Sequence, residues 1–249
     1  MSFLDRIRPE KLAEAEALRS APPDPASGGP TRGFHAALVA PGISAIAELK
    51  RRSPSRGDIR PGADPVDIAR AYAANGARAL SVLTDGPHFG GSLHDLERVR
   101  EAVALPVLRK DFILSEVQLD QTRAWGADAA LLIVAMLDQA TLTRLHAHAV
   151  GLGLDVLVET HDAEEIARAL DAGATIVGVN NRNLHSLSID LATCETLLPS
   201  LPEGIVRVAE SGLRTREEVQ RMRTDAILVG SSLMTAPDPG QALRELLCG

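Results

Sequence analysis

Residues 154–180 read LDVLVETHDAEEIARALDAGATIVGVN, and this stretch contains the unit from which the fold is built. Two short apolar runs, 154–160 and 175–180, enclose a segment that reads as a helix. Asp162 stands where a helix N-cap belongs, and Gly173 stands where a C-terminal cap belongs. Both runs are continuously apolar, which is typical of parallel strands covered by helices on both faces. The stretch therefore predicts a strand, a helix and a second, parallel strand.

The same unit repeats from residue 43 to the end of the chain. Further cap residues mark the other units: Gly76 and Gly126 stand at predicted helix ends, and Asp64, Ser92 and Ser115 stand at predicted helix starts. Eight strand–helix units in 249 residues predict a single (β/α)8 TIM barrel. A doubly wound open sheet is the alternative, but the chain lacks a Gly-rich dinucleotide fingerprint, so closure is favoured. The apolar runs are ISAIAEL, ALSVLT, PVLRKD, AALLIVA, LDVLVET, TIVGVN, IVRVAE and AILVG.

Residues 1–42 precede the first strand and are predicted to be an extension of the same domain, with the barrel at 43–249. Residues 3–19 form an amphipathic pattern in which Phe3, Ile7 and Leu12 belong to the apolar positions. A loop rich in Pro and Gly follows at 21–33. The extension is too small to hold a core of its own.

Composition narrows the possible partners. The formal net charge of −7 argues against bulk affinity for nucleic acid or an anionic membrane. The longest apolar stretch, residues 127–137, is too short to span a bilayer and carries Asp128. The N-terminus lacks the apolar core of a secretory signal. The two cysteines form no motif, so we expect a soluble, cytoplasmic chain.

Metal and nucleophile motifs are absent from the sequence. The seven histidines show no metal-ligand spacing, and His146 and His148, two apart on a predicted helix, are expected to be solvated. No G-x-S-x-G elbow occurs. We therefore expect no metal and no serine-type triad.

Charged residues end several of the apolar runs. In PVLRKDF, residues 106–112, the run stops at Arg109, Lys110 and Asp111. In a barrel of this kind the active site forms where the strands end, and residues two apart share a face. The ionisable residues at these ends then surround one cavity as an acid/base set: Glu48, Lys50, Lys110, Glu159 and Glu210.

Two loops late in the chain, AESGLRT at 209–215 and VGSSLM at 229–234, follow the seventh and eighth strands. Loops at these places frequently form a phosphate site. Ser53 and Arg182 are candidate further donors. Phe89 and Phe112 lie beside the charged set, where they could face an aromatic substrate or simply pack within their loops.

Together these segments resemble the indole-3-glycerol-phosphate synthase family. The resemblance spans residues 46–234 in order and is carried by IAELKRRSPSRG (46–57), VLTDGPHFGGS (82–92), VLRKDF (107–112), GADAALLI (126–133), LVET (157–160), VGVNNRNL (177–184), VAESGL (208–213) and LVGSSLM (228–234).

This resemblance implies conversion of 1-(2-carboxyphenylamino)-1-deoxyribulose 5-phosphate to indole-3-glycerol phosphate, with loss of carbon dioxide and water, in tryptophan biosynthesis. Lys110 matches the family's general acid and Glu159 its base, while Lys50 pairs with the substrate carboxylate and is a candidate second acid. The sequence leaves open which lysine acts at which step. The resemblance implies no cofactor. The other matched positions are Glu48, Asn180 and Glu210 for orientation, Ser53, Arg182, Ser211, Gly212, Gly230 and Ser231 for phosphate, and Phe89, Phe112 and Leu184 for the aromatic ring.

Two other functions compete with this interpretation. A different phosphosugar barrel enzyme, such as phosphoribosylanthranilate isomerase, shares the phosphate loops but has no reason for Lys50, Lys110 and Glu159 together. An idle phosphate-binding barrel would be expected to have lost part of the charged set. A monomer is the expected assembly, and a second enzyme of the pathway stays open as a partner.

Overall fold

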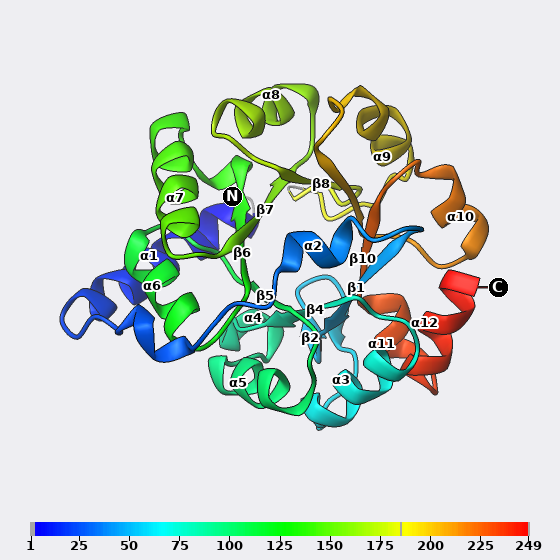
Figure 1. The fold of residues 1–249 in the computed structure, drawn as a ribbon, viewed down its shortest axis with the longest axis horizontal. Coiled ribbons are helices and arrows are strands. Elements are labelled where there is room, and N and C mark those ends of the chain that lie inside the picture. The colour runs from blue at the N-terminus through cyan, green and yellow to red at the C-terminus, as the bar shows by residue number, and fades with distance from the viewer. Residues whose placement is uncertain (1–2, 185, 249) are drawn as a thin grey trace.

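The computed structural model describes residues 3–184 and 186–248, and its centre is a closed barrel of eight parallel strands (Figure 1). The strands follow one another around the barrel in chain order, and the last, β10, pairs with the first, β1. The predicted TIM barrel is confirmed, and the open-sheet alternative is wrong. The barrel strands are β1 (Ser44–Leu49), β4 (Ala79–Leu83), β5 (Val107–Lys110), β6 (Ala129–Ile133), β7 (Asp155–Thr160), β8 (Ile176–Asn180), β9 (Val206–Glu210) and β10 (Ala226–Val229).

One outer helix follows each barrel strand, and the caps explain where these helices begin. The side chains of Asp64, Ser92 and Asp162 accept hydrogen bonds from backbone N–H groups in the first turns, and Ser115 forms a capping box with Gln118. The outer helices are α3 (Pro65–Ala74), α5 (Leu93–Ala102), α6 (Glu116–Ala124), α7 (Gln139–Gly151), α8 (Ala163–Asp171), α9 (Ala192–Leu197), α10 (Arg216–Arg221) and α12 (Pro239–Cys248).

Smaller elements decorate the loops. A two-stranded antiparallel ribbon, β2 (Arg52–Ser53) with β3 (Gly57–Asp58), follows β1. The remaining short helices are η1 (Pro25–Gly28), α2 (Phe34–Leu38), α4 (Gly86–Phe89), η2 (Val134–Met136), η3 (Leu198–Ser200) and α11 (Ser231–Thr235).

Aliphatic side chains fill the barrel, as the low aromatic content requires. Ile46, Leu108, Leu131 and Ile176 each come from a different strand and are at most 1% exposed. Complete burial of such side chains contributes about 1.5–3 kcal/mol each. The packed interior leaves only the ends of the barrel open to ligands.

The extension closes one end of the barrel. The backbone N–H groups of Arg32 and His35 donate to Asp128 and Asp155, which lie at or just before the starts of β6 and β7. The helix α2 therefore lies over the amino ends of the strands, in the middle of the barrel as Figure 1 shows it. The carboxyl ends stay open on the opposite side.

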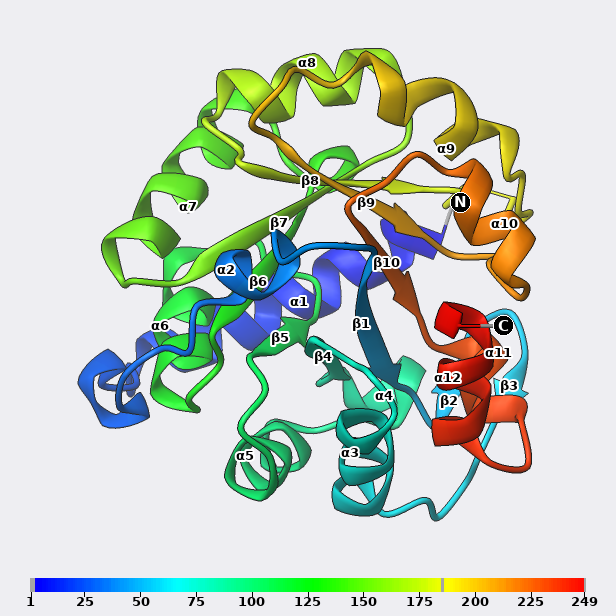
Figure 2. The same ribbon diagram turned by 45° about the vertical axis from the view of Figure 1, so that its right-hand side comes forward.

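The first helix, α1 (Phe3–Arg19), takes a different path and lies against α6 (Figure 2). Its residues Phe3, Ile7 and Lys11 are buried, whereas Leu12 is 47% exposed. The prediction that Leu12 belongs to the buried face is therefore wrong, and the neighbouring lysine takes that place.

The expectation of two solvated histidines on α7 also fails for one of them. His146 is buried, with Gly173 beside its ring, and burial lowers its pKa. His148 faces outward and lies 2.8 Å from Asp120 on α6. Residues two apart on a helix do point in different directions, and here one of those directions is the core.

Within residues 3–184 and 186–248, no helix has the length and apolar character that crossing a membrane requires. In the same part of the chain, no three His, Cys, Asp or Glu side chains are grouped to share a metal ion.

Candidate active site

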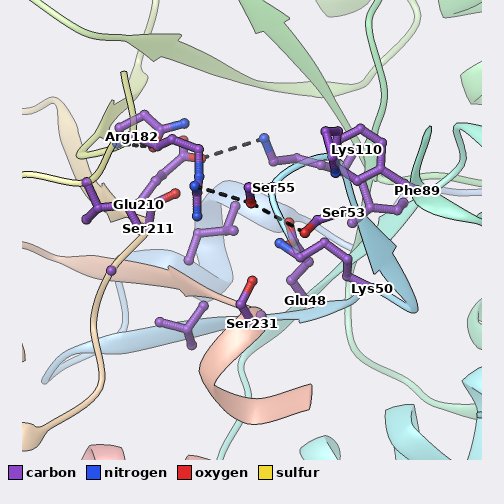
Figure 3. Close-up of a pocket in the computed structure, with 18 of the residues that line it drawn as sticks. Glu48, Lys50, Ser53, Ser55, Phe89, Lys110, Arg182, Glu210, Ser211 and Ser231 are labelled. Atoms are coloured by element: carbon purple, nitrogen blue, oxygen red, sulfur yellow. Dashed lines mark hydrogen bonds and ion pairs between the residues drawn. The ribbon is translucent and has the colours of Figure 1, made fainter. Parts of the chain in front are cut away.

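A cavity of about 460 Å³ opens at the carboxyl ends of the barrel strands (Figure 3). Its wall includes every residue predicted from the sequence as a site residue. The charged and amide members are Glu48, Lys50, Lys110, Glu159, Asn180 and Glu210; the others are Ser53, Phe89, Phe112, Arg182, Leu184, Ser211, Gly212, Gly230 and Ser231.

Lys110 is the centre of the charged set. Its ammonium nitrogen lies 2.8 Å from Glu159 Oε2 and 3.7 Å from a carboxylate oxygen of Glu210. These residues reach one another across the barrel because each is at or near the end of its strand. Asn180 donates from its side-chain amide to the other oxygen of Glu159 at 2.9 Å. The carboxylate of Glu159 is thus held at both oxygens.

A second ion pair lies on the neighbouring wall of the cavity. Lys50 Nζ is 2.5 Å from Glu48 Oε1, and Glu48 is almost fully buried. The two residues share a face as their spacing predicts. The charged set therefore contains two lysines that are each paired with a carboxylate, and one further carboxylate, Glu210.

The pairing sets the protonation states. Burial alone would lower the pKa of Lys110, but the three carboxylates around it outweigh burial and raise the pKa. Burial alone would raise the pKa of Glu159, but Lys110 and His161 hold it well below its usual range. Burial, reinforced by the charge of Glu159, raises the pKa of Glu210 to about 8. The site therefore favours the charged forms of Lys110 and Glu159 and the neutral form of Glu210.

Two glycines make room for these carboxylates. A Cβ at residue 178 on β8 would clash with Glu210 Oε1, and a Cβ at residue 230 would lie 2.6 Å from Glu48 Oε1. Close approach of a side chain to backbone is what glycine permits in a strand. The glycines in VGVN and VGSS are therefore part of the site's construction, and Gly178 escaped the sequence reasoning.

The phosphate-type loops form the opposite wall. Ser211 and Gly212 both have positive φ, 66° and 90°, which turns the chain sharply after β9. Ser231 begins α11 directly after β10. Arg182 donates to the carbonyl of Leu187 at 2.9 Å, while burial and the nearby Arg56 lower its pKa. This wall presents a guanidinium, hydroxyls and turn backbone to an anion.

Aromatic rings line the third side. Phe89 and Phe112 lie with ring centroids 6.0 Å apart, and Phe3 of α1 packs edge-on against both, at 6.4 and 6.1 Å. Leu184 is a further apolar residue of the cavity wall. The sequence reasoning missed Phe3, because nothing in an N-terminal helix indicates which barrel loop it will meet.

The three charges of PVLRKDF have different environments. Lys110 points into the cavity, whereas Arg109 is buried behind it and bonds Thr84 and Thr122. Asp111 takes hydrogen bonds from Thr84 at 2.5 Å and Arg109 at 3.0 Å. Alternation along the strand separates the middle residue from its neighbours.

Lys11 of α1 completes this buried cluster. Its ammonium lies 2.9 Å from each of Asp85, Asp111 and Glu14, and its side chain is 3% exposed. The sequence carries a signal for it: Leu4, Ile7 and Lys11 fall on one helical face, so the lysine interrupts an apolar stripe.

Comparison with known proteins assigns the chain to the same family that its sequence motifs resemble. Residues 4–246 match the family model described as indole-3-glycerol phosphate synthase. A protein of that name from Chlorobium phaeovibrioides is 49% identical and covers 96% of both chains. One from Mycobacteroides abscessus is 45% identical over 99% of this chain and 92% of its own length. One from Streptomyces griseus is 51% identical over 85% of this chain and 80% of its own length.

Among solved structures, two distant barrels share the fold. Thiamine phosphate pyrophosphorylase from Pyrococcus furiosus superposes with a TM-score of 0.60 at 18% identity, and covers 82% of this chain and 93% of its own. KGPDC from Streptococcus mutans has a TM-score of 0.63 at 12% identity, with 82% and 95% covered. Fold likeness at this identity says nothing of the reaction, whereas the family match spans nearly the whole chain. The chain belongs to the indole-3-glycerol phosphate synthase family.

Proposed function

We propose that this chain converts 1-(2-carboxyphenylamino)-1-deoxyribulose 5-phosphate to indole-3-glycerol phosphate, releasing carbon dioxide and water, by proton transfer between its own side chains and the substrate. The observation that carries the proposal is the Lys110–Glu159 pair, 2.8 Å apart at the floor of a cavity that has an anion wall and an aromatic wall. The substrate has a phosphate at one end and an anthranilate ring at the other.

Lys110 is the general acid. In ring closure the aromatic carbon attacks the ribulose carbonyl carbon, and the carbonyl oxygen takes up a proton to become a hydroxyl. The raised pKa of Lys110 keeps this lysine protonated at neutral pH, ready to supply that proton. Lys50, across the cavity, pairs with the substrate carboxylate and supplies the second proton donor needed when the hydroxyl leaves as water. Glu48, Asn180 and Glu210 orient these groups and the substrate hydroxyls.

Glu159 is the general base, and its strength depends on Lys110. In the free site its pKa is depressed mainly by the neighbouring ammonium, so it is a weak base. Once Lys110 has given up its proton, that stabilising charge is gone and the affinity of Glu159 for a proton rises. The first proton transfer thus prepares the base for the proton abstraction that follows decarboxylation.

The remaining wall residues bind the two ends of the substrate. The phosphate is held by Ser53, Arg182 and the turns at 211–212 and 230–231, where hydroxyl and backbone N–H donors converge with a guanidinium. The anthranilate ring packs against Phe89, Phe112 and Leu184. We further propose that the enzyme acts in the cytoplasm as a monomer, with the barrel at 43–249 and the extension at 1–42 as one domain.

A fluorescence assay tests the proposal. Purified protein is mixed with the proposed substrate without added metal, and indole emission is followed with and without EDTA. We expect emission to rise at the same rate in both. Binding of phosphate compounds without any indole signal would instead favour the idle barrel or a different phosphosugar substrate.

A further inference from the structure

His161 lies directly behind Glu159 and outside the cavity. It follows β7 by one residue, and its Nε2 is 3.5 Å from Glu159 Oε1. This nitrogen is buried and has no hydrogen-bond partner. The imidazole is not part of the cavity wall, so any effect on the reaction must pass through Glu159.

A second carboxylate holds the ring in this place. Glu165 Oε2, in the first turn of α8, accepts from the backbone N–H of His161 at 2.7 Å and lies 2.9 Å from its Nδ1. A carboxylate at Nδ1 fixes that nitrogen as a donor and turns Nε2 toward Glu159. The side chains of His161 and Glu165 are 16% and 14% exposed, which limits the competition from water.

We propose that His161, oriented by Glu165, is a positioning residue for the catalytic base: its Nε2–H holds Glu159 Oε1 and keeps Glu159 ionised and correctly turned when Lys110 leaves it for the substrate. This inference rests on the proposed role of Glu159. In the free site Lys110 supplies most of the compensating charge, but its ammonium must move to, and then protonate, the substrate. Asn180 then remains on Oε1 as a neutral donor, and His161 is the cationic group left beside it.

Charge supports the geometry. Burial alone would lower the pKa of His161, but the neighbouring carboxylates of Glu159 and Glu165 outweigh burial and raise the pKa to about 10. The ring is therefore an imidazolium at neutral pH, and its contact with Glu159 becomes a charge-assisted hydrogen bond on a small closing movement.

Two amide substitutions separate the two sides of the ring. In His161→Gln the side-chain amide reaches the place of Nε2 and retains a donor toward Glu159. In His161→Asn the amide reaches only the place of Nδ1, so the link to Glu165 is kept and the link to Glu159 is lost. We expect His161→Asn to lower kcat about 10-fold, which is less than the 10²–10⁴-fold typical of losing an acid or base itself. His161→Gln should lower kcat by about 3-fold or less. KM should stay within about 2-fold in both, since the residue does not touch the substrate.

The reverse order would overturn the inference: wild-type kcat in His161→Asn with loss in His161→Gln means that the ring only anchors the loop to Glu165. Equal losses in both variants together with an equal fall in melting temperature would overturn it as well. Glu165→Gln provides a coupling test, because it should lower kcat in the wild type and have no further effect on His161→Asn.

Glu159→Gln, measured alongside, separates the two levels of the argument. If this variant is inactive and the His161 variants behave like the wild type, the positioning role alone fails. If Glu159→Gln keeps wild-type kcat, the assignment of the base fails and the inference fails with it.

Discussion

Replacing Lys11 with methionine tests how the N-terminal helix is attached to the active site. Methionine fills most of the same volume but removes the charge that lies 2.9 Å from Asp85 and from Asp111. Both carboxylates are at most 2% exposed. In the wild type, Lys11 and Arg109 balance these two acids; in Lys11→Met one buried negative charge is left without a partner.

The expected loss of stability can be estimated from the least costly way in which the cluster can remove its unpaired charge. One aspartate can take up a proton, and for a carboxyl with an ordinary pKa near 3.9 this costs about 4 kcal/mol at pH 7. That figure agrees with the roughly 3–5 kcal/mol lost when one partner of a buried pair is removed. For a chain of this size each kcal/mol corresponds to about 2–4 °C in melting temperature. We expect Lys11→Met to melt about 10 °C below the wild type.

Thermal unfolding followed by circular dichroism measures this difference, with two companion variants. Glu14→Gln removes the third partner of Lys11, whose side chain is 46% exposed, and an exposed pair of this kind is worth only about 0–1 kcal/mol. The double variant Lys11→Met with Asp85→Asn restores charge balance and should recover about half of the loss. A melting temperature of Lys11→Met within 2 °C of the wild type, within error of Glu14→Gln, would refute the reasoning, since a buried uncompensated charge could not be that cheap.

Three further predictions follow from the cavity. Lys110→Ala should lower turnover, measured by steady-state kinetics, by about 10²–10⁴-fold, while the Kd for phosphate compounds, measured by calorimetry, changes little. A comparable loss of phosphate binding with turnover retained would contradict the proposed role of Lys110 as the acid. The raised pKa of Glu210 favours its neutral form, so the neutral variant Glu210→Gln should keep turnover within about 3-fold at pH 7. Because the folded-state pKa near 8 lies above the ordinary value of 4.5, wild-type stability falls as pH rises between these values while the variant's does not; urea titrations at pH 5 and pH 9 compare the two. Gly178→Ala places a methyl group against the Glu210 carboxylate and should lower both turnover and melting temperature. Gly151→Ala, at the end of α7, is the control, because its Cβ would meet no atom within 4 Å and its φ is not positive.

The fold could be predicted because the sequence repeats one strand–helix unit eight times. Within each unit an apolar run predicts the strand, and a cap such as Asp162 or Gly173 marks an end of the helix. The number of units then predicts that the sheet closes into a barrel. The charged set of the cavity could be predicted for the same reason: once the strands are placed, Lys110 and Glu159 meet at their carboxyl ends.

The parts that sequence reasoning missed depend on contacts between distant segments. Lys11 and Phe3 belong to a helix whose docking partner no local pattern specifies. The predictions for Leu12 and His146 were wrong because the pattern of apolar and polar residues sets only the average orientation of a helix. A single buried ion cluster, as at Lys11, or a single core imidazole, as at His146, departs from that pattern. His161 stands beside Glu159 in the chain, yet only the geometry shows that its ring turns toward that carboxylate.

The path of the N-terminal helix has a consequence for synthesis. This helix is translated before every strand of the barrel, yet Arg8 bonds the carbonyl of Met136, 128 residues later in the chain. At about 5–20 residues per second that partner is made roughly 6–25 s afterwards. A lone helix of 17 residues is marginal in water, so Phe3, Leu4 and Ile7 are exposed during this interval. The helix therefore completes its contacts long after it is made, and on a ribosome stalled before Met136 it lacks the carbonyl that Arg8 binds.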